Sequence, residues 1–269
     1  MHYREFDPPR RVGELVECFW IYRADDRDLQ RIAPDGRCEI VVHLAGRFHE
    51  VGPSGSIMQP EALFAGQLTS PLHLQATGTV WSVCARLRPA AAGSYLRQAA
   101  ASATDRRIPL ADLDPLGAER LPSILRLATS DEARVAALAD HVEGRFRASP
   151  IALDARVEDA VRRLEDLSFP SPGAVASALP LNLRTLQRLF KRHVGVSPQA
   201  YASVVRFRRI FDELSATAST LSDAAYAAGY SDHPQMAREF QRFLGCSATR
   251  FASERKLLAA ALTGPRHRT

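Results

Sequence analysis

Arginine and glutamine side chains recur in residues 183–193 at a spacing that places them on one side of a helix. Leu186, Leu189 and Phe190 lie three and four residues apart, so a helix here would bury them together and leave the polar side chains exposed. Arginine pairs bidentately with guanine O6 and N7, and glutamine pairs in the same way with adenine N6 and N7. The polar side chains on the opposite side of this helix include Arg184, Thr185, Gln187 and Arg188.

A second segment, residues 233–243, has the same character. Met236, Phe240 and Phe243 are its apolar positions, and Pro234 suits the first turn of a helix, where a missing backbone N–H costs nothing. The polar side chains that remain available here include His233, Gln235 and Arg238. Phosphate contacts position a protein on DNA without reading its sequence. We expect them from Lys191, Arg192, Arg206, Arg208, Arg209 and Arg242.

A short helix and a tight turn precede each segment, which is the plan of a helix-turn-helix unit. The first unit is expected at residues 173–194, with Asn182 as the N-cap of its second helix. The second is expected at residues 219–243, where Gly229 makes the turn and Ser231 or Asp232 is the cap. Between the units, residues 199–214 have helical periodicity and predict a rod of about 24 Å.

These features resemble the AraC/XylS family of bacterial regulators over residues 153–257. The resemblance is carried by Ala176, Arg184–Lys191, Gly195–Pro198, Tyr201, Arg206, Ala225, Gly229–Asp232, Arg238–Phe240 and Gly245. It implies a sequence-specific transcription regulator whose partners are double-stranded DNA, a small-molecule effector and RNA polymerase. It also implies that base edges are contacted from the two helices by Arg184, Thr185, Gln187, Arg188, His233, Gln235 and Arg238. The chain departs from the family pattern at Pro180, Asn182, Pro234, Met236 and Ser247-Ala248. These departures make base contacts less expected from the second of the two helices than from the first.

Residues 1–150 are predicted to form a sensor or dimerisation domain, strand-rich over 1–90 and helical over 90–147. Apolar, β-branched and aromatic runs at 15–22, 39–44 and 80–87 are separated by Gly, Pro and Asp turns. Helical spacing follows at 90–101, 121–127, 132–145 and 153–167. The expected fold class is α+β multidomain. Its second domain, residues 151–262, is an all-α double helix-turn-helix joined by a long helix.

The N-terminal half resembles two kinds of module that precede this type of DNA-binding domain. One is a cupin-like barrel. The other is a poorly characterised sensor module, matched at Cys18–Trp20, Pro34–Gly36, Gly52-Pro53 and Trp81–Pro89. Neither resemblance identifies a ligand. The aromatic residues that could line an effector pocket are Trp20, Tyr22, Phe64 and Trp81, although aromatic strand residues more often serve packing.

Metal and cofactor sites are not expected. His43, His49 and His73 lack the close spacing and nearby glutamate of a metal-binding cupin. No Ser-His-Asp arrangement, phosphate loop or dinucleotide fingerprint is visible, so we predict that the chain is not an enzyme. Residues 132–145 carry Val135, Leu138, Ala139 and Val142 at helical spacing. This face could pair with a second copy of the chain or pack within its own.

Charge is divided unevenly along the chain. Residues 170–269 hold 14 Lys and Arg against six Asp and Glu, whereas the rest of the chain holds 21 against 24. A basic end is typical of a polyanion-binding module. The four scattered cysteines, the charged N-terminus and the lack of a long apolar run predict a cytoplasmic protein without membrane contact. The alternatives are a metal-dependent cupin-type enzyme with an appended basic domain and a protein-binding adaptor. The adaptor is disfavoured because the exposed positions are Arg and Gln.

Overall fold

The larger of two sheets forms the centre of the N-terminal half. The computed structural model describes residues 2–25, 27–166, 169, 171–216 and 220–251. The six antiparallel strands are, in spatial order, β1 (His2–Phe6), β2 (Val16–Ala24), β9 (Val80–Leu87), β4 (Cys38–Ala45), β7 (Ala62–Ala65) and β10 (Arg107–Pro109). The three strands predicted from the sequence are therefore neighbours. Their apolar residues alternate, so Phe19, Ile40 and Ala85 lie on one fully buried face.

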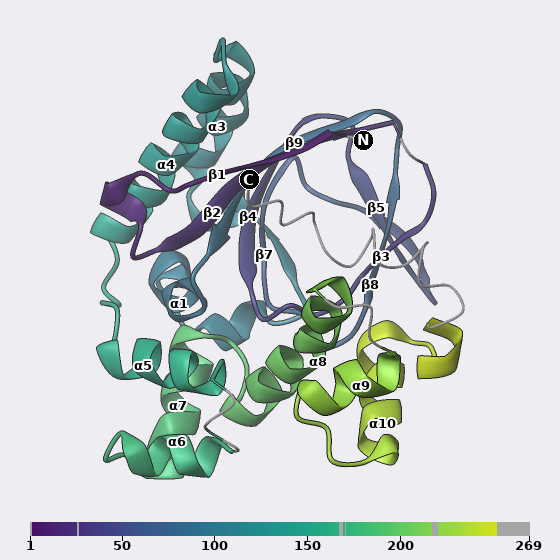
Figure 1. The fold of residues 1–269 in the computed structure, drawn as a ribbon. Helices are drawn as coiled ribbons and strands as arrows, with labels where there is room; N and C mark the ends of the chain where they lie inside the picture. Colours follow the sequence, from purple (N-terminus) through teal and green to yellow (C-terminus); the bar gives the residue numbers. More distant parts are fainter. Residues whose placement is uncertain (1, 26, 167–168, 170, 217–219, 252–269) are drawn as a thin grey trace.

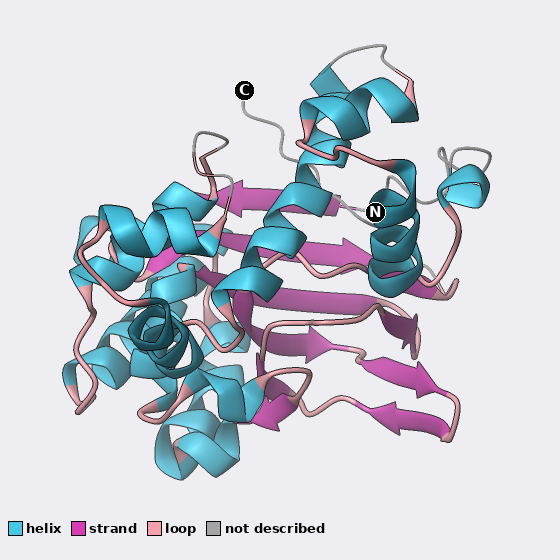
Figure 2. Cartoon of the chain, turned by 90° about the horizontal axis from the view of Figure 1, so that it is seen from below, coloured by secondary structure: helices cyan, strands magenta, loops and turns pink. Residues whose placement is uncertain are grey.

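A second sheet of four strands faces the first. Its strands are, in spatial order, β3 (Gln30–Ile32), β8 (Leu72–Ala76), β5 (Phe48–Gly52) and β6 (Gly55–Met58). Tyr22 of the larger sheet packs against this second sheet, with its ring centroid 6.4 Å from that of Phe48. Figure 1 shows the two sheets facing each other, and Figure 2 shows the strands side by side with the helices outside.

Helices cover the outer face of the larger sheet. They are a 3-10 turn (Arg10–Val12), a second 3-10 turn (Pro89–Ala91), α1 (Ala92–Leu96), a third 3-10 turn (Ala100–Ala103), α2 (Leu110–Leu113), α3 (Pro115–Leu127) and α4 (Asp131–Arg147). A single helix over 90–101 was expected, but the chain is broken there. Arg97 adopts φ 58 and ψ 21, the left-handed conformation that ends a helix. No helix among the described residues has the length and apolar character needed to cross a membrane.

The apolar face of α4 packs within its own chain. Val135, Leu138, Ala139 and Val142 belong to the same buried cluster as Phe19 and Ile40. The dimerisation surface considered for residues 132–145 is therefore used by the intrachain core, because an apolar stripe at helical spacing fits its own sheet as well as it would fit a second helix. On α3, by contrast, three large apolar side chains stay exposed: Leu116, Ile124 and Leu127.

The C-terminal half is all helical and contains two small cores. Its helices are α5 (Ala155–Leu164), α6 (Pro172–Ala178), α7 (Leu183–His193), α8 (Pro198–Ala216), α9 (Leu221–Ala227) and α10 (His233–Leu244). The first core joins α5, α6 and α7 to the start of α8, through Phe190 and Tyr201. The second joins α9 and α10 to the rest of α8, through Phe207 and Phe240. The expected α+β class, with a long helix joining two helical units, is confirmed.

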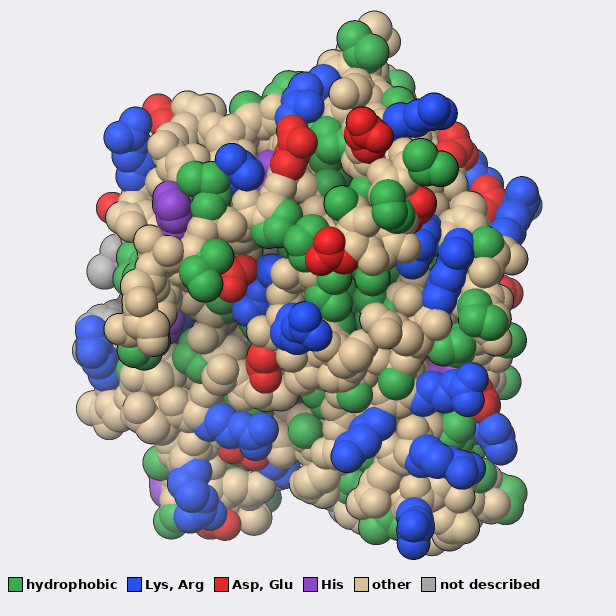
Figure 3. All heavy atoms as spheres, turned by 180° about the vertical axis from the view of Figure 1, so that it is seen from behind, with side chains coloured by type: hydrophobic (Ala, Val, Ile, Leu, Met, Phe, Trp, Pro, Cys, Tyr) green, Lys and Arg blue, Asp and Glu red, His purple; other side chains and the backbone are tan. Residues whose placement is uncertain are grey.

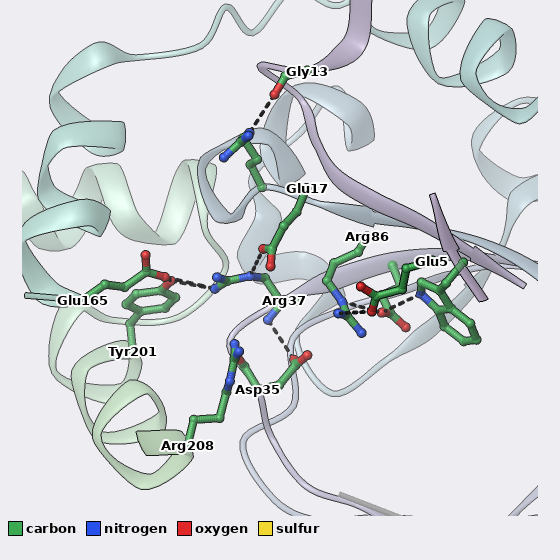
Figure 4. A network of polar contacts seen from close by, with 12 residues as sticks. Glu5, Gly13, Glu17, Asp35, Arg37, Arg86, Glu165, Tyr201 and Arg208 are labelled. Carbon is green, nitrogen blue, oxygen red and sulfur yellow. Dashed lines mark hydrogen bonds and ion pairs between the residues drawn. The ribbon is translucent and has the colours of Figure 1, made fainter. Parts of the chain in front are cut away.

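A buried arginine joins the two halves of the molecule (Figure 4). Arg37 follows the turn at residues 34–36 and forms ion pairs with Glu17 of β2 and with Glu165, whose Oε1 is 3.1 Å from Nη1. The same Nη1 donates to the Tyr201 hydroxyl at 3.0 Å, and that hydroxyl donates to Glu165 at 2.6 Å. Burial opposes the charge on Arg37, but Tyr201 and the two carboxylates raise its pKa above the usual value. The guanidinium therefore stays charged.

Close backbone packing at Gly93 is a second contact between the halves. A Cβ atom at this position of α1 would lie 2.2 Å from the Arg192 carbonyl oxygen, which no real structure tolerates. Thr104, just after the third 3-10 turn, donates to the Gly195 carbonyl at 2.8 Å. The end of α7 is thus fitted against the N-terminal half, with no room for a side chain on α1 at this point.

We predict that Gly93→Ala lowers the free energy of unfolding by about 1–3 kcal/mol, because the added methyl group must push two backbones apart. The matched control is Gly144→Ala on α4, where a Cβ would meet nothing within 4 Å. That change should leave stability equal or raise it by up to about 1 kcal/mol, since alanine favours helix. Urea unfolding of both variants measures the difference, and equal stabilities would contradict the packing described.

Candidate nucleic-acid interface

The helix α7 begins where the sequence predicts and exposes the predicted side chains. The Asn182 side chain accepts a hydrogen bond from the Thr185 backbone N–H at 2.8 Å, which satisfies one of the unpaired donors at the helix start. Leu186 and Phe190 are fully buried. Thr185 is half-buried beside the cap. The side chains left exposed on this helix include Arg184, Gln187, Arg188, Lys191 and Arg192.

The helix α10 repeats this arrangement. Asp232, one of the two expected caps, accepts from the Gln235 backbone N–H at 2.6 Å, and Pro234 lies in the first turn. Gly229 has φ 89 in the preceding turn, a conformation that glycine adopts without a Cβ clash. Met236, Phe240 and Phe243 are buried. The exposed positions are His233, Pro234, Ala237, Arg238, Gln241 and Arg242, while Gln235 is half-buried.

The two units are held on one rod. At about 1.5 Å per residue, the 19 residues of α8 extend roughly 28 Å. One core lies at its start and the other along its second half. Figure 3 shows Lys and Arg side chains over both lobes of the lower part of the molecule, with few acidic side chains among them. The helical half therefore has two basic surfaces joined through α8. Positive charge of this kind attracts a polyanion such as DNA.

The residues expected at phosphates are not equivalent in the structure. Lys191, Arg192 and Arg242 are exposed, and Arg209 is half-buried. Arg206 forms an ion pair with Glu239 of α10, at 2.7 Å, and its guanidinium lies 4.9 Å from the centre of the Tyr230 ring. Arg208 donates to the Asp35 carbonyl at 3.1 Å and so contacts the N-terminal half. These two arginines have structural partners within the chain.

A polar groove between α8 and α10 contains residues that sequence reasoning missed. Its volume is about 400 Å³, and its lining is Gln199, Ser203, Arg206, Gln235, Arg238, Glu239 and Arg242. Gln199, Ser203 and Arg206 follow one another four and three residues apart along α8. This spacing puts them on one helix face. The signal was therefore present in the sequence, as three polar residues at helical spacing on α8.

The four aromatic residues considered for an effector pocket do not surround one cavity. In the strand register Trp20 pairs with Cys84 and Tyr22 with Ser82, on the face that looks toward the second sheet. Phe64 and Trp81 belong to the opposite face, where they pack in or against the main core. Strand residues alternate between faces, and a list of aromatic residues taken from several strands ignores that parity.

The three histidines considered as metal ligands also diverge. The His43 ring lies 5.9 Å from the Phe48 ring, between the two sheets. His49 and His73 lie on the other face of the second sheet, because His49 pairs with Gln75 while Phe48 pairs with Ala76. Within the described part of the chain, no group of three or more His, Cys, Asp or Glu side chains could hold a metal ion.

Comparison with known families divides the chain in two. Residues 175–254 match a family described as a helix-turn-helix domain, and they include both capped helices and the rod between them. Residues 4–109 match a family described as a domain of unknown function, DUF6597. The second match covers the two sheets and agrees with the poorly characterised sensor module that the sequence resembles.

Similar proteins match about a third of this chain. The transcriptional activator RhaS of Enterobacter sp. (strain 638) is 34% identical over 91 residues, which are 33% of this chain and 33% of that protein. RhaS of Escherichia fergusonii is 31% identical over 96 residues, 35% and 34% of the two chains. The match thus spans about a third of the length of these relatives. Among solved structures, fatty-acid-bound ToxT from Vibrio cholerae has a TM-score of 0.48 and 12% identity, over 91% of this chain and 95% of that one.

The different surroundings of Arg206 and Arg242 predict different effects on stability. Arg206→Ala should lower the free energy of unfolding by about 2 kcal/mol, because it leaves the largely buried Glu239 without its cation. Arg242→Ala, on the exposed side of α10, should stay within about 0.5 kcal/mol of the parent protein. Thermal or urea unfolding gives both values. A loss of the same size in the two variants would show that Arg206 has no structural role.

Proposed function

We propose that this chain, whose residues 175–254 form an AraC-type helix-turn-helix domain, is a sequence-specific regulator of transcription that binds double-stranded DNA. One observation carries the proposal. Two capped helices, α7 and α10, bury their apolar sides in separate small cores and leave Arg and Gln side chains exposed. Both cores also contain residues of the long helix α8, which joins the two units. A solvated basic surface alone would need neither the duplication nor the matched caps.

The exposed side chains divide into two roles on physical grounds. Arg184, Gln187 and Arg188 have the donors and acceptors that identify bases in the major groove, and we assign the first unit to base reading. Arg238 and His233 would contribute from the second unit. Lys191, Arg192 and Arg242 lie exposed on α7 and α10, where a cation can neutralise a phosphate without identifying a base.

We divide the chain at about residue 150 and assign regulation to the part before it. The match of residues 4–109 to a family without an assigned function leaves the ligand of that part to be found. We propose that it senses a small molecule or brings two chains together, that the whole protein acts by binding rather than catalysis, and that it works in the cytoplasm, where its DNA and RNA polymerase are.

The apolar stripe of α3 is the surface that we propose for a second copy of this chain. Leu116, Ile124 and Leu127 are 75%, 49% and 82% exposed, although large apolar side chains seldom cluster on a free surface. Glu119 and Arg120 are exposed between them. In an antiparallel pair related by a two-fold axis, Leu116 meets the partner subunit's Leu127, so that one patch complements itself.

Arg188→Ala tests the base-reading assignment. We expect it to weaken binding to the preferred site by about 1–3 kcal/mol and to relax the preference at one base position, because a bidentate arginine contact is lost. The measurement is selection of bound fragments from random DNA, followed by affinity measurements on the selected sites. A variant with the affinity and selectivity of the parent protein would remove Arg188 from the reading surface.

Lys191→Ala on the same helix is the matched comparison. Its loss should weaken all sequences alike and lower the slope of log affinity against log salt by about one unit, because one fewer counterion is released. Titrations at several salt concentrations, on a preferred and an unrelated fragment, separate the two roles. An unchanged slope would contradict the phosphate assignment.

The dimer proposal predicts that Leu127→Glu shifts the protein toward monomer. A charge at this position would be buried against the partner's Leu116. The control is Leu29→Glu, an exposed leucine outside the stripe, which should leave the mass unchanged. Sedimentation velocity over a range of concentrations gives the mass. A parent protein that stays monomeric throughout, or dimers that persist in Leu127→Glu, would rule out this surface.

A further inference from the structure

A cavity of about 510 Å³ lies where β4 ends and the turn to β5 begins. Its lining is His43, Leu44, Ala45, Gly46, Arg47, Met58, Glu61, Thr77 and Arg126. Protein sites for small molecules generally measure about 300–1,000 Å³, so the volume suits one small organic ligand. The lining combines apolar side chains with two arginines, and the question is which ligand charge it favours.

The two arginines of the cavity have different partners. Arg126 is paired with Glu61 and also donates to the Leu44 carbonyl at 3.1 Å. Arg47 forms no ion pair with a described carboxylate. Its guanidinium makes only a long contact, 3.5 Å, to the Gln59 carbonyl. The charges of Arg126 and Glu61 cancel, so the lining has an excess of one positive charge, located on Arg47.

His43 adds a buried polar group to the same cavity. Its side chain belongs to a residue only 2% exposed, and its Nδ1 lies 2.8 Å from the Ser82 hydroxyl. The Gln59 side chain is close, yet Nε2 has no hydrogen bond of normal geometry. Burial lowers the pKa of His43 to about 4, so the ring is neutral at pH 7. The neutral ring adds no charge to the lining, so the excess positive charge stays on Arg47.

We propose that this cavity binds a small organic monocarboxylate. Arg47 pairs with the carboxylate, and Ala45 and Met58 contact the apolar body. A doubly charged acid is disfavoured because only one cation is uncompensated. An uncharged ligand would leave Arg47 without a counter-ion. The inference rests on the proposed function in one respect: it supplies the effector of the regulator.

The position of the cavity connects it to the DNA-binding half. β4 runs from Cys38, next to the buried Arg37, to Ala45 in the cavity wall. Arg37 contacts Tyr201 of α8, the rod that carries both helix-turn-helix units. A ligand that favours one conformation of β4 would therefore change DNA affinity only if it also favours one position of α8. The coupling between ligand binding and DNA binding can be measured as the change in DNA affinity that the ligand causes.

The test uses the full-length chain with isotope-labelled histidine, and benzoate and hexanoate as probes. The His43 ring signal is assigned by its loss in His43→Gln. Titration with either acid, up to about 10 mM, should shift this signal in a saturable way, whereas benzamide and hexanamide, which have the same bodies without charge, should not. Arg47→Gln should weaken binding of the acids by about tenfold or more, because it removes the charge-assisted pair. The control Arg27→Gln, an exposed arginine outside the cavity lining, should bind like the parent protein.

The outcomes separate this inference from the proposed function. No saturable shift with either acid, equal shifts with the amides, or full binding by Arg47→Gln overturns the carboxylate site. DNA binding by the parent protein is measured on the same samples with and without benzoate. Retained DNA binding without a benzoate shift rejects the site alone. A benzoate shift in a chain that selects no DNA sequence keeps the site and rejects the regulator.

Discussion

The burial of one charged side chain, Arg37, governs how the two halves of this protein fit together. An arginine that is 90% enclosed is tolerated only when carboxylates and hydrogen-bond acceptors surround it, since an unpaired charge in the interior is costly. Its partners come from three separate segments, β2, the residue after α5, and α8. All three must be in place at once. The cluster therefore favours one position of the helical half over others that would bury the same apolar area.

This junction ties the first helix-turn-helix unit to the N-terminal half more closely than the second. Ala90, just after β9, is part of the core that contains Phe190, and Gly93 packs on the backbone at the end of α7. The second unit meets the N-terminal half through smaller contacts, such as Ala33 against its core and Arg208 on the Asp35 carbonyl. A change within the sheets would thus reach α7 directly and α10 through α8. The first unit is thus the more firmly attached of the two.

Much of the helical half was predictable because its determinants are local. The bounds of α7 follow from an N-cap at Asn182 and apolar residues at Leu186, Leu189 and Phe190, which all lie within three turns of one another. The same holds for Asp232 and α10. The prediction was wrong at residues 90–101, where helical composition continues through Arg97 but the backbone turns left-handed. There the 3-10 turns and α1 pack against α7, and packing outweighs a weak helical preference.

The sequence by itself determined which residues form the reading helices, which of their faces are apolar, and that the unit is duplicated. These properties depend on side chains a few positions apart on the same helix. Only the tertiary structure decided which basic residues remain free and which aromatic residues share a face. Arg206 meets Glu239 across two helices, Arg208 meets Asp35 from the other half of the chain, and Trp20 and Trp81 lie on opposite faces of one sheet. The reason is that an ion pair or a shared face is set by strand register and by contacts between residues far apart in sequence, about which local periodicity carries no information.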